Sequence, residues 1–402
     1  MPEVDVAKVL SKRLMPLFVA AFFQSFVFWY TVEKLFMRSI GFTNTDIGFM
    51  VAVYSAVMLL VDTPSGILAD RWSRKGVLML ASVCLALSAI AGGLSHGIGG
   101  YLICAVLWGI FFACYSGMYD SIIYDTLSET APGHDLYDRY YGRVQFLDSL
   151  GLVISSLIGG YIAARTNLRA VYFLTVPIAL LPVAALARLK EPSLHKQGIV
   201  PTLPKQLKAT LKAITTNRSL LPVIIVLILR SALIFCIFEF DQLWLIALHM
   251  PTAYYGLANA ILLSSIGLGS ILVGRLKLGR YIRMLPVLAL MLMGSLGLIF
   301  FRNYVAIIGS TSVFATSIVV IYIVFSRILH DNLQSSIRAG AASATNTLGR
   351  FSIIPIALLI GVVSQRFTIF HAGYILLLLA ILLSLFVHLV GRRSNYGDLK
   401  IN

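Results

Sequence analysis

The sequence has little charge and little cysteine for its length. Only 12% of its 402 residues are Asp, Glu, Lys or Arg, whereas 58% are hydrophobic, and this balance excludes an ordinary soluble globular domain. The four cysteines form no CxxC pair, which favours packed thiols over a metal or redox site. The sequence also shows no nucleotide-binding P-loop and no segment that would form a soluble catalytic domain. We therefore expect no metal, no cofactor and no enzymatic activity.

Long apolar runs take the place of charge. Runs of about 18 or more apolar residues are typical of transmembrane helices, and residues 77–95 and 303–326 contain no Lys, Arg, Asp or Glu. The whole pattern predicts an all-α membrane protein with twelve transmembrane helices, and the first is too long for a signal-peptide core. The predicted helices are residues 14–37, 46–69, 76–95, 99–125, 143–164, 169–188, 220–248, 253–273, 283–301, 303–327, 339–364 and 368–391.

The basic residues follow alternate loops. With the N-terminus inside, 24 of the 32 Lys and Arg residues fall on the cytoplasmic side, as the positive-inside rule expects. Arg230 and Arg350 fall within the membrane, and the outer ones are Lys34, Arg38, Arg165, Arg169, Arg302 and Arg366. This distribution predicts that both termini are cytoplasmic, and it accounts for the net charge of +15 without a nucleic-acid partner.

A polar segment with three prolines divides the predicted helices into six and six. The predicted parts are an N-terminal half at residues 1–188, a cytoplasmic linker at 189–219 and a C-terminal half at 220–402. Transporters built from two such halves bind their substrate near the midplane between them.

The linker has an amphipathic pattern. Leu203, Leu207, Leu211 and Ile214 share one helical face. The pattern indicates either a helix on an anionic cytoplasmic lipid leaflet or a solvated linker helix.

A dense charge cluster follows the second predicted helix. Residues 66–75 read GILADRWSRK, which resembles the G-x-L-a-D-R-x-G-R-K signature of the major facilitator superfamily, with Ser73 where the family usually has Gly. A shorter basic copy without the acid, residues 274–280, follows the eighth predicted helix. The resemblance implies the major facilitator fold and transport by alternating access.

The same resemblance implies a cytoplasmic gate. The alternative is that the cluster only anchors its loop to lipid headgroups. The gate residues are Gly66, Asp70, Arg71, Arg74 and Lys75.

The fifth predicted helix carries spaced small residues. Gly142, Gly151, Gly159 and Gly160 resemble the family's antiporter signature, with two serines in place of its Gly-Pro. Small residues at this spacing let helices approach closely, and the match favours export by antiport.

Two ionisable residues are expected far inside the membrane, where each needs a partner or a function. Asp62 lies about 12 Å and Arg350 about 16 Å above the cytoplasmic boundary at 1.5 Å per helical residue. The resemblance implies that their helices face each other. We therefore expect an interdomain pair, with partners inside each half as the alternative.

The fourth predicted helix carries a second acidic pattern. Ser116, Asp120 and Tyr124 share one helical face by their spacing. Asp120 lies at a depth similar to that of Asp62, and it could take up and release the proton that antiport requires.

Structural ion pairs are the alternative for these acids. Arg139 and Arg143 are the basic residues that could pair with Asp120 or Asp125, and Arg143 is also a plausible partner for Asp148.

The first and seventh predicted helices add aromatic and charged residues. The resemblance implies that the first, fourth, seventh and tenth helices face the cavity. The aromatic residues and carboxylates suit a lipophilic cation, whereas Arg230 suits an anionic substrate. The candidate cavity residues are Gln24, Trp29, Glu33, Asp120, Tyr124, Arg230 and Glu239, and the candidate proton-coupling residues are Asp120, Asp62 and Glu239.

These patterns predict a monomeric secondary transporter in the cell membrane. The leading hypothesis is proton-coupled export of small amphipathic compounds, so the expected partners are a small-molecule substrate, protons and the bilayer with its anionic cytoplasmic lipid. An uptake permease or uniporter for a small organic anion or metabolite is the alternative. A membrane enzyme or sensor would need clustered catalytic residues or a large soluble domain, and the sequence shows neither.

Overall fold

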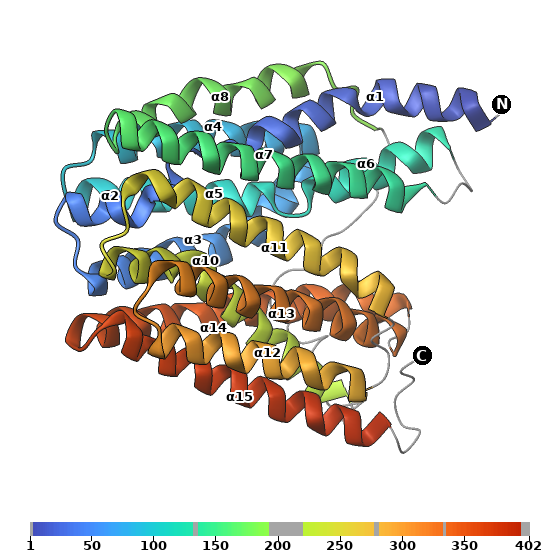
Figure 1. Cartoon of the computed structure of the whole chain (residues 1–402). Helices are drawn as coiled ribbons and strands as arrows, with labels where there is room; N and C mark the ends of the chain where they lie inside the picture. The colour runs from blue at the N-terminus through green and yellow to red at the C-terminus, as the bar shows by residue number, and fades with distance from the viewer. Residues whose placement is uncertain (1–2, 132–135, 193–219, 277–280, 333–334, 395–402) are drawn as a thin grey trace. The chain divides into compact units, whose positions relative to one another are not determined.

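The computed structural model describes residues 3–131, 136–192, 220–276, 281–332 and 335–394, and all regular structure in these ranges is helical. The predicted amphipathic linker helix and the side chains of the second basic cluster lie outside the described residues. The helices of Figure 1 are α1 (Glu3–Gln24), η1 (Tyr30–Val32), α2 (Glu33–Ser39), α3 (Asn44–Arg71), α4 (Arg74–Leu94), α5 (Ile98–Tyr115), α6 (Met118–Thr130), α7 (Tyr137–Arg165), α8 (Ala170–Ala187), α10 (Leu221–Ala247), η4 (Thr252–Tyr254), α11 (Tyr255–Leu276), α12 (Tyr281–Phe300), α13 (Tyr304–Asp331), α14 (Ser335–Arg366) and α15 (Ile369–Ser394).

Eleven helical spans in the described part of the chain are long and apolar enough to cross a membrane. They correspond to the second to twelfth predicted segments, with ends that differ by up to eight residues. The first predicted segment is not one helix, because α1 ends at Gln24 and the chain resumes regular structure only at η1. The number twelve and the cytoplasmic termini stay predictions.

Two predicted helices are broken inside their apolar segments. The first is interrupted between Gln24 and Tyr30, and the fourth is divided into α5 and α6 at Ser116 and Gly117. Gly117 has a φ of +73°, a left-handed conformation that glycine adopts without steric cost. Broken backbone at membrane depth is tolerated where protein buries it or where it lines a water-filled cavity, so these two breaks point to a site.

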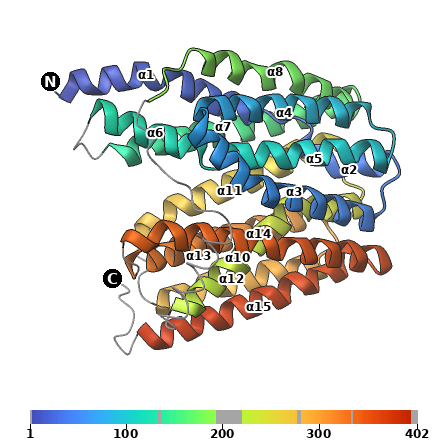
Figure 2. The same cartoon turned by 180° about the vertical axis from the view of Figure 1, so that it is seen from behind.

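The chain forms two compact units. Unit 1 comprises Met1–Gly41, Ala56–Val200 and Thr252–Ala260, and unit 2 comprises the remainder, so that α3 and α11 each contribute to both. Within unit 1, α1, α4 and α8 lie side by side in both views (Figures 1 and 2). The predicted division into halves at residues 188 and 220 stays a prediction.

Aromatic residues fill the core of each unit. In unit 1, the fully buried Trp29 ring stacks on Tyr172 with ring centroids 5.1 Å apart. In unit 2, α10 packs against α13, α14 and α15. The buried Trp244 of α10 donates its indole N–H to the carbonyl oxygen of Leu298 at 2.8 Å. These two indoles thus lie in the packed interior of their own units.

Candidate functional site

The break in the first segment lies against α4, α6 and α7 of unit 1. Gln24, the last residue of α1, is 1% exposed. Its side-chain carbonyl accepts a hydrogen bond from the Tyr119 hydroxyl at 2.7 Å, and its amide donates to the Ser82 hydroxyl at 2.9 Å. Gln24, predicted to face the cavity, therefore ties α1 to α4 and α6 in this structure.

Asp148 of α7 lies where the two helix breaks meet. Ser25, the first residue of the break after α1, and Tyr115, the last residue of α5, both donate to Asp148 Oδ1, the latter at 2.8 Å. No cation pairs with this carboxylate among the described residues. The expected pair with Arg143 is wrong, because that exposed guanidinium lies over the Phe18 ring at 5.3 Å.

Sequence reasoning missed the importance of Asp148. The sequence does set this residue apart, because Asp148 is the one charged residue from 144 to 164. A lone carboxylate in an apolar span has the same cost whether or not a nearby arginine is visible in the sequence. The two hydroxyl partners, at residues 25 and 115, could not be identified before the breaks were known.

Glycines bring α7 close to the first segment. A Cβ built on Gly151 would lie 2.4 Å from the Phe22 carbonyl oxygen, and one on Gly159 would lie 2.4 Å from the Phe28 carbonyl oxygen. A Cβ on Gly160 would lie 2.5 Å from the Gly256 nitrogen, whereas one on Gly142 would meet no atom within 4 Å. Three of the four motif glycines therefore stand at close backbone approaches, and Asp148 lies three residues before the first of them, Gly151.

Two further cavity candidates are buried in unit 1. Glu33 is 5% exposed and forms an ion pair with its neighbour Lys34, which is 1% exposed. The Tyr101 hydroxyl donates to Glu33 Oε1 at 2.9 Å. Trp29 lies in the aromatic core described above. These placements bury Glu33 and Trp29 in unit 1, and their role as cavity residues stays a prediction.

Asp120 and Tyr124 share an exposed face of α6. The Tyr137 hydroxyl at the start of α7 donates to Asp120, and the Tyr137 ring lies 6.3 Å from that of Tyr124. Ser116 does not continue this face, because Gly117 breaks the helix before Asp120. The alternative that Asp120 pairs with Arg139 or Arg143 is wrong, because among the described residues its hydrogen-bond partner is the Tyr137 hydroxyl.

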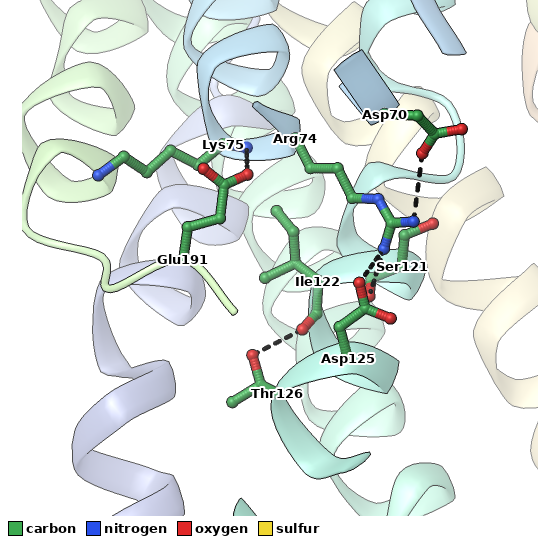
Figure 3. Close-up of polar contacts among 8 residues, drawn as sticks. All are labelled: Asp70, Arg74, Lys75, Ser121, Ile122, Asp125, Thr126 and Glu191. Atoms are coloured by element: carbon green, nitrogen blue, oxygen red, sulfur yellow. Dashed lines mark hydrogen bonds and ion pairs between the residues drawn. The ribbon is translucent and has the colours of Figure 1, made fainter. Parts of the chain in front are cut away.

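Arg74 organises the predicted gate cluster (Figure 3). Its guanidinium forms ion pairs with Asp125 of α6 and, at 3.3 Å, with Asp70 one helical turn earlier. It also donates to the Ser121 carbonyl oxygen at 3.3 Å. Asp125 is therefore paired with Arg74, and the expectation of Arg139 or Arg143 as its partner is wrong. The cluster joins α3, α4 and α6 within unit 1.

Ser73 and Lys75 fix the start of α4. Ser73 is the N-cap in an extended conformation, and its hydroxyl accepts from the Gly76 N–H at 2.8 Å and donates to Glu191 at 2.6 Å. The Lys75 N–H donates to the same carboxylate at 3.1 Å, and its ammonium donates to the Leu189 carbonyl oxygen at 2.9 Å. The serine in place of the family's glycine thus acts as a favourable helix cap.

Gly66, the first residue of the predicted gate, is not at a close approach. A Cβ built on it would meet no atom within 4 Å.

Arg74→Gln is expected to destabilise unit 1, whereas Arg71→Gln is not. Arg74 is 17% exposed and forms ion pairs with two carboxylates, so its removal breaks both pairs and costs about 2 kcal/mol. Arg71 is exposed, and its loss should stay within about 0.5 kcal/mol. Thermal unfolding of the purified variants measures this difference. Equal unfolding midpoints would show that the Arg74 pairs contribute nothing to stability.

Unit 2 carries a second charged region on α10. The Arg230 guanidinium lies over the Tyr322 ring of α13 at 3.9 Å from the ring centroid. Glu239 lies two to three helical turns further along α10 and is 4% exposed. Near it, the backbone N–H of Gln242 donates to the Asp241 side chain at 2.7 Å.

Asp62 of α3 belongs to unit 1 and Arg350 of α14 belongs to unit 2. Their predicted pairing stays a prediction.

The described residues contain no group of three or more His, Cys, Asp or Glu side chains that could hold a metal ion. Cys84, Cys104, Cys114 and Cys236 are buried free thiols.

A family profile described as the Major Facilitator Superfamily matches residues 14–355, which is most of the chain. The chain belongs to the major facilitator superfamily. It is accordingly a multi-pass membrane protein and a transporter, not an enzyme.

Curated relatives of this superfamily member are distant. The chain is 20% identical over 142 residues to the quinolone resistance protein NorA of Staphylococcus aureus (strain MRSA252), a match covering 35% of each chain. It is 27% identical over 172 residues to the efflux pump azaK of Aspergillus niger (strain ATCC 1015), covering 41% of this chain and 33% of that one. The matches span about a third of the length of each relative.

Solved structures share the major facilitator fold over nearly the whole chain. The nucleoside transporter NupG gives a TM-score of 0.72 at 16% identity and covers 95% of this chain and 98% of that one. A D-xylose–proton symporter gives a TM-score of 0.72 at 15% identity, with 94% and 97% covered. At these identities the likeness establishes the fold alone.

Proposed function

We propose that this chain exports small amphipathic compounds in exchange for protons, and that Asp148 binds the proton. The observation that carries the proposal is a carboxylate inside a membrane span whose described partners are two neutral hydroxyls. The names of the two curated relatives, a quinolone resistance protein and an efflux pump, support export.

The chemistry of Asp148 favours proton exchange. An ionised carboxylate away from water needs a cation or several strong donors, and hydroxyls compensate only part of the cost. Binding one proton removes the charge and its cost. A change of hydration at the same carboxylate then returns the proton to water, which is the exchange that antiport requires.

The two hydroxyls connect the proton to the shape of unit 1. Ser25 belongs to the break in the first segment, and Tyr115 ends α5 next to the break at Gly117. An ionised carboxylate accepts both hydrogen bonds more strongly than a protonated one, since charge-assisted hydrogen bonds are about twice as strong. Protonation therefore loosens the two points at which the first and fourth segments bend.

The other acids remain secondary candidates for proton coupling. Asp120 is exposed beside Tyr137, Asp62 lies in α3, and Glu239 is buried in α10. We favour Asp148 over these three because its position joins both helix breaks.

Proton movement in liposomes tests the proposal. The purified protein is reconstituted with a pH-sensitive dye inside, and lipophilic cations, anions and neutral compounds are added in turn. A transported compound is expected to move protons in the opposite direction, and an imposed pH gradient should drive its accumulation. If neither the pH gradient nor a protonophore changes the rate or extent of compound transport, proton antiport is overturned and the uniporter alternative is supported. Co-movement of compound and proton in one direction would support uptake.

A further inference from the structure

Arg230 is a membrane-embedded arginine that forms no ion pair or hydrogen bond with a described residue. Its described contact is the Tyr322 ring, 3.9 Å from the guanidinium carbon to the centroid. Its Nε is fully buried and has no hydrogen-bond partner. The residue as a whole is only partly buried, and Tyr322 is 36% exposed. The terminal N–H groups therefore lie at an accessible edge of unit 2 while the stem is packed.

The other arginines that lie over rings differ from Arg230. Arg302 lies 3.7 Å from the Phe370 centroid, and it also donates to the carbonyl oxygens of residues 299 and 301 at 2.6 and 3.1 Å. Arg169 lies over Phe36 and donates to the Gly93 carbonyl oxygen at 2.6 Å. The remaining two, Arg143 and Arg165, are exposed and reach water. In this described set, Arg230 alone is partly buried and donates no hydrogen bond to a described residue.

The depth of Arg230 makes its unfilled donors informative. It lies nine residues from the first residue of α10, and Tyr322 lies nine residues from the last residue of α13, about 13 Å along each helix. A charge at this depth is costly without a partner, a hydrated space or a ligand. Tyr322 supplies the ring face, which supports the cation but accepts no N–H bond.

The neighbouring helix α14 contacts α10 directly beside Arg230. A Cβ built on Gly349 of α14 would lie 2.7 Å from the Ser231 Cβ, so α14 contacts α10 directly after Arg230. Arg350 follows Gly349 in the sequence. Two arginines therefore follow or precede this helix contact in sequence, one on α10 and one on α14.

We propose that Arg230, supported by Tyr322, binds the anionic group of the transported compound, a carboxylate or a similar singly charged oxyanion. The planar guanidinium offers two parallel N–H bonds to such a group, and this geometry distinguishes a carboxylate from an amide or an ester. The proposal deepens the proposed function, on which it rests, by naming the charged part of the amphipathic substrate. It argues against lipophilic cations as the preferred class.

A set of matched ligands tests this site without requiring transport. The probes are naphthalene derivatives that carry a carboxylate, a primary amide or a trimethylammonium group, and binding is measured calorimetrically on the full chain in zwitterionic nanodiscs. We expect the carboxylate to bind the wild-type protein at least about tenfold more tightly than the amide, equivalent to about 1.4 kcal/mol. Arg230→Gln should abolish this preference, and Arg230→Lys, which keeps the charge without the fork, should retain part of it.

Arg302→Gln is the matched control, because Arg302 also lies over a ring but is exposed and already donates to two backbone carbonyl oxygens. It should keep the carboxylate preference. Equal binding of carboxylate and amide to the wild-type protein, or a preference that survives Arg230→Gln, would overturn the proposal. If the Arg230→Gln protein elutes as an aggregate, the Arg230→Lys and Tyr322→Leu variants replace it. Both variants must then reduce the preference for the carboxylate over the amide.

Anionic lipid is a second source of the same chemistry. If nanodiscs that contain phosphatidylglycerol abolish carboxylate binding to the wild-type protein but leave the Arg230→Gln protein unchanged, the occupant is a lipid phosphate and the substrate assignment is wrong. Because binding is measured without a proton gradient, a protein that binds carboxylates through Arg230 and moves no protons would retain this site and overturn only the antiport proposal.

Discussion

Asp148→Asn is expected to reduce compound-driven proton movement to the background of empty liposomes. Asparagine has nearly the same shape and keeps an oxygen that can accept from Ser25 and Tyr115, whose hydroxyls donate to Asp148 in the native chain. It cannot bind and release a proton. The variant is therefore fixed in the state that resembles the protonated carboxylate.

This expectation separates coupling from movement of the compound itself. The Asp148→Asn protein should still exchange labelled for unlabelled compound across the membrane at equal pH, because that exchange needs no net proton transfer. It should fail to accumulate the compound under an imposed pH gradient. Both reactions are measured in the same liposomes, so a difference between them cannot arise from reconstitution yield.

Asp138→Asn is the control on the same helix. Asp138 is exposed in the first turn of α7, whereas Asp148 is three helical turns further into the span. The control should retain both reactions. Proton movement that persists in Asp148→Asn and disappears in Asp120→Asn would transfer the proton-binding role to Asp120. Loss of both exchange and thermal stability in Asp148→Asn would make Asp148 a structural residue.

Hydropathy was enough to predict the helical spans but not their breaks. A window of about 19 residues averages over a local change of backbone, so the segments around residues 24–29 and 116–117 read as continuous apolar helices. Gly117 could have been noticed as a residue that permits a left-handed turn. Nothing in the sequence indicated that Ser25 and Tyr115 approach one carboxylate.

Ion-pair partners could be predicted from the sequence only where both residues lie on the same helix. The Asp70–Arg74 pair follows from i,i+4 spacing on one helix. Arg143 was a poor choice for Asp148, because residues five apart on a helix point about 140° apart at 3.6 residues per turn. Asp125 pairs with Arg74 from another helix, a contact that depends on the packing of α4 against α6 and has no counterpart in sequence spacing.

Gly256→Ala is expected to have a large destabilising effect, because its methyl group would clash with the backbone of the neighbouring helix. A Cβ at this position would lie 2.4 Å from the Ser156 carbonyl oxygen and 3.1 Å from the Gly160 Cα. Backbone atoms cannot rotate away as a side chain can, so α7 and α11 must separate. We expect a loss of stability near the upper end of the roughly 1–3 kcal/mol that overpacking costs.

The same separation would weaken a neighbouring polar contact. Asn259, about one helical turn after Gly256, donates to the Ser156 hydroxyl of α7 at 2.8 Å. Moving the helices apart by the few tenths of an ångström that a methyl group requires lengthens this bond. The effect of Gly256→Ala should therefore exceed that of Asn259→Ala alone, and thermal unfolding of both purified variants measures the difference.

Gly267→Ala on the same helix should change stability in the opposite direction. No atom lies within 4 Å of a Cβ built on Gly267, so alanine adds only its better helix propensity, about 1 kcal/mol in favour of the folded state. A rise in the unfolding midpoint for Gly267→Ala and a fall for Gly256→Ala would show that the close approach to α7, and not glycine replacement as such, sets the outcome. If both variants were stabilised, α7 and α11 would have to be separated at Gly256 in the membrane, and the small residues of α7 would need a role other than close packing.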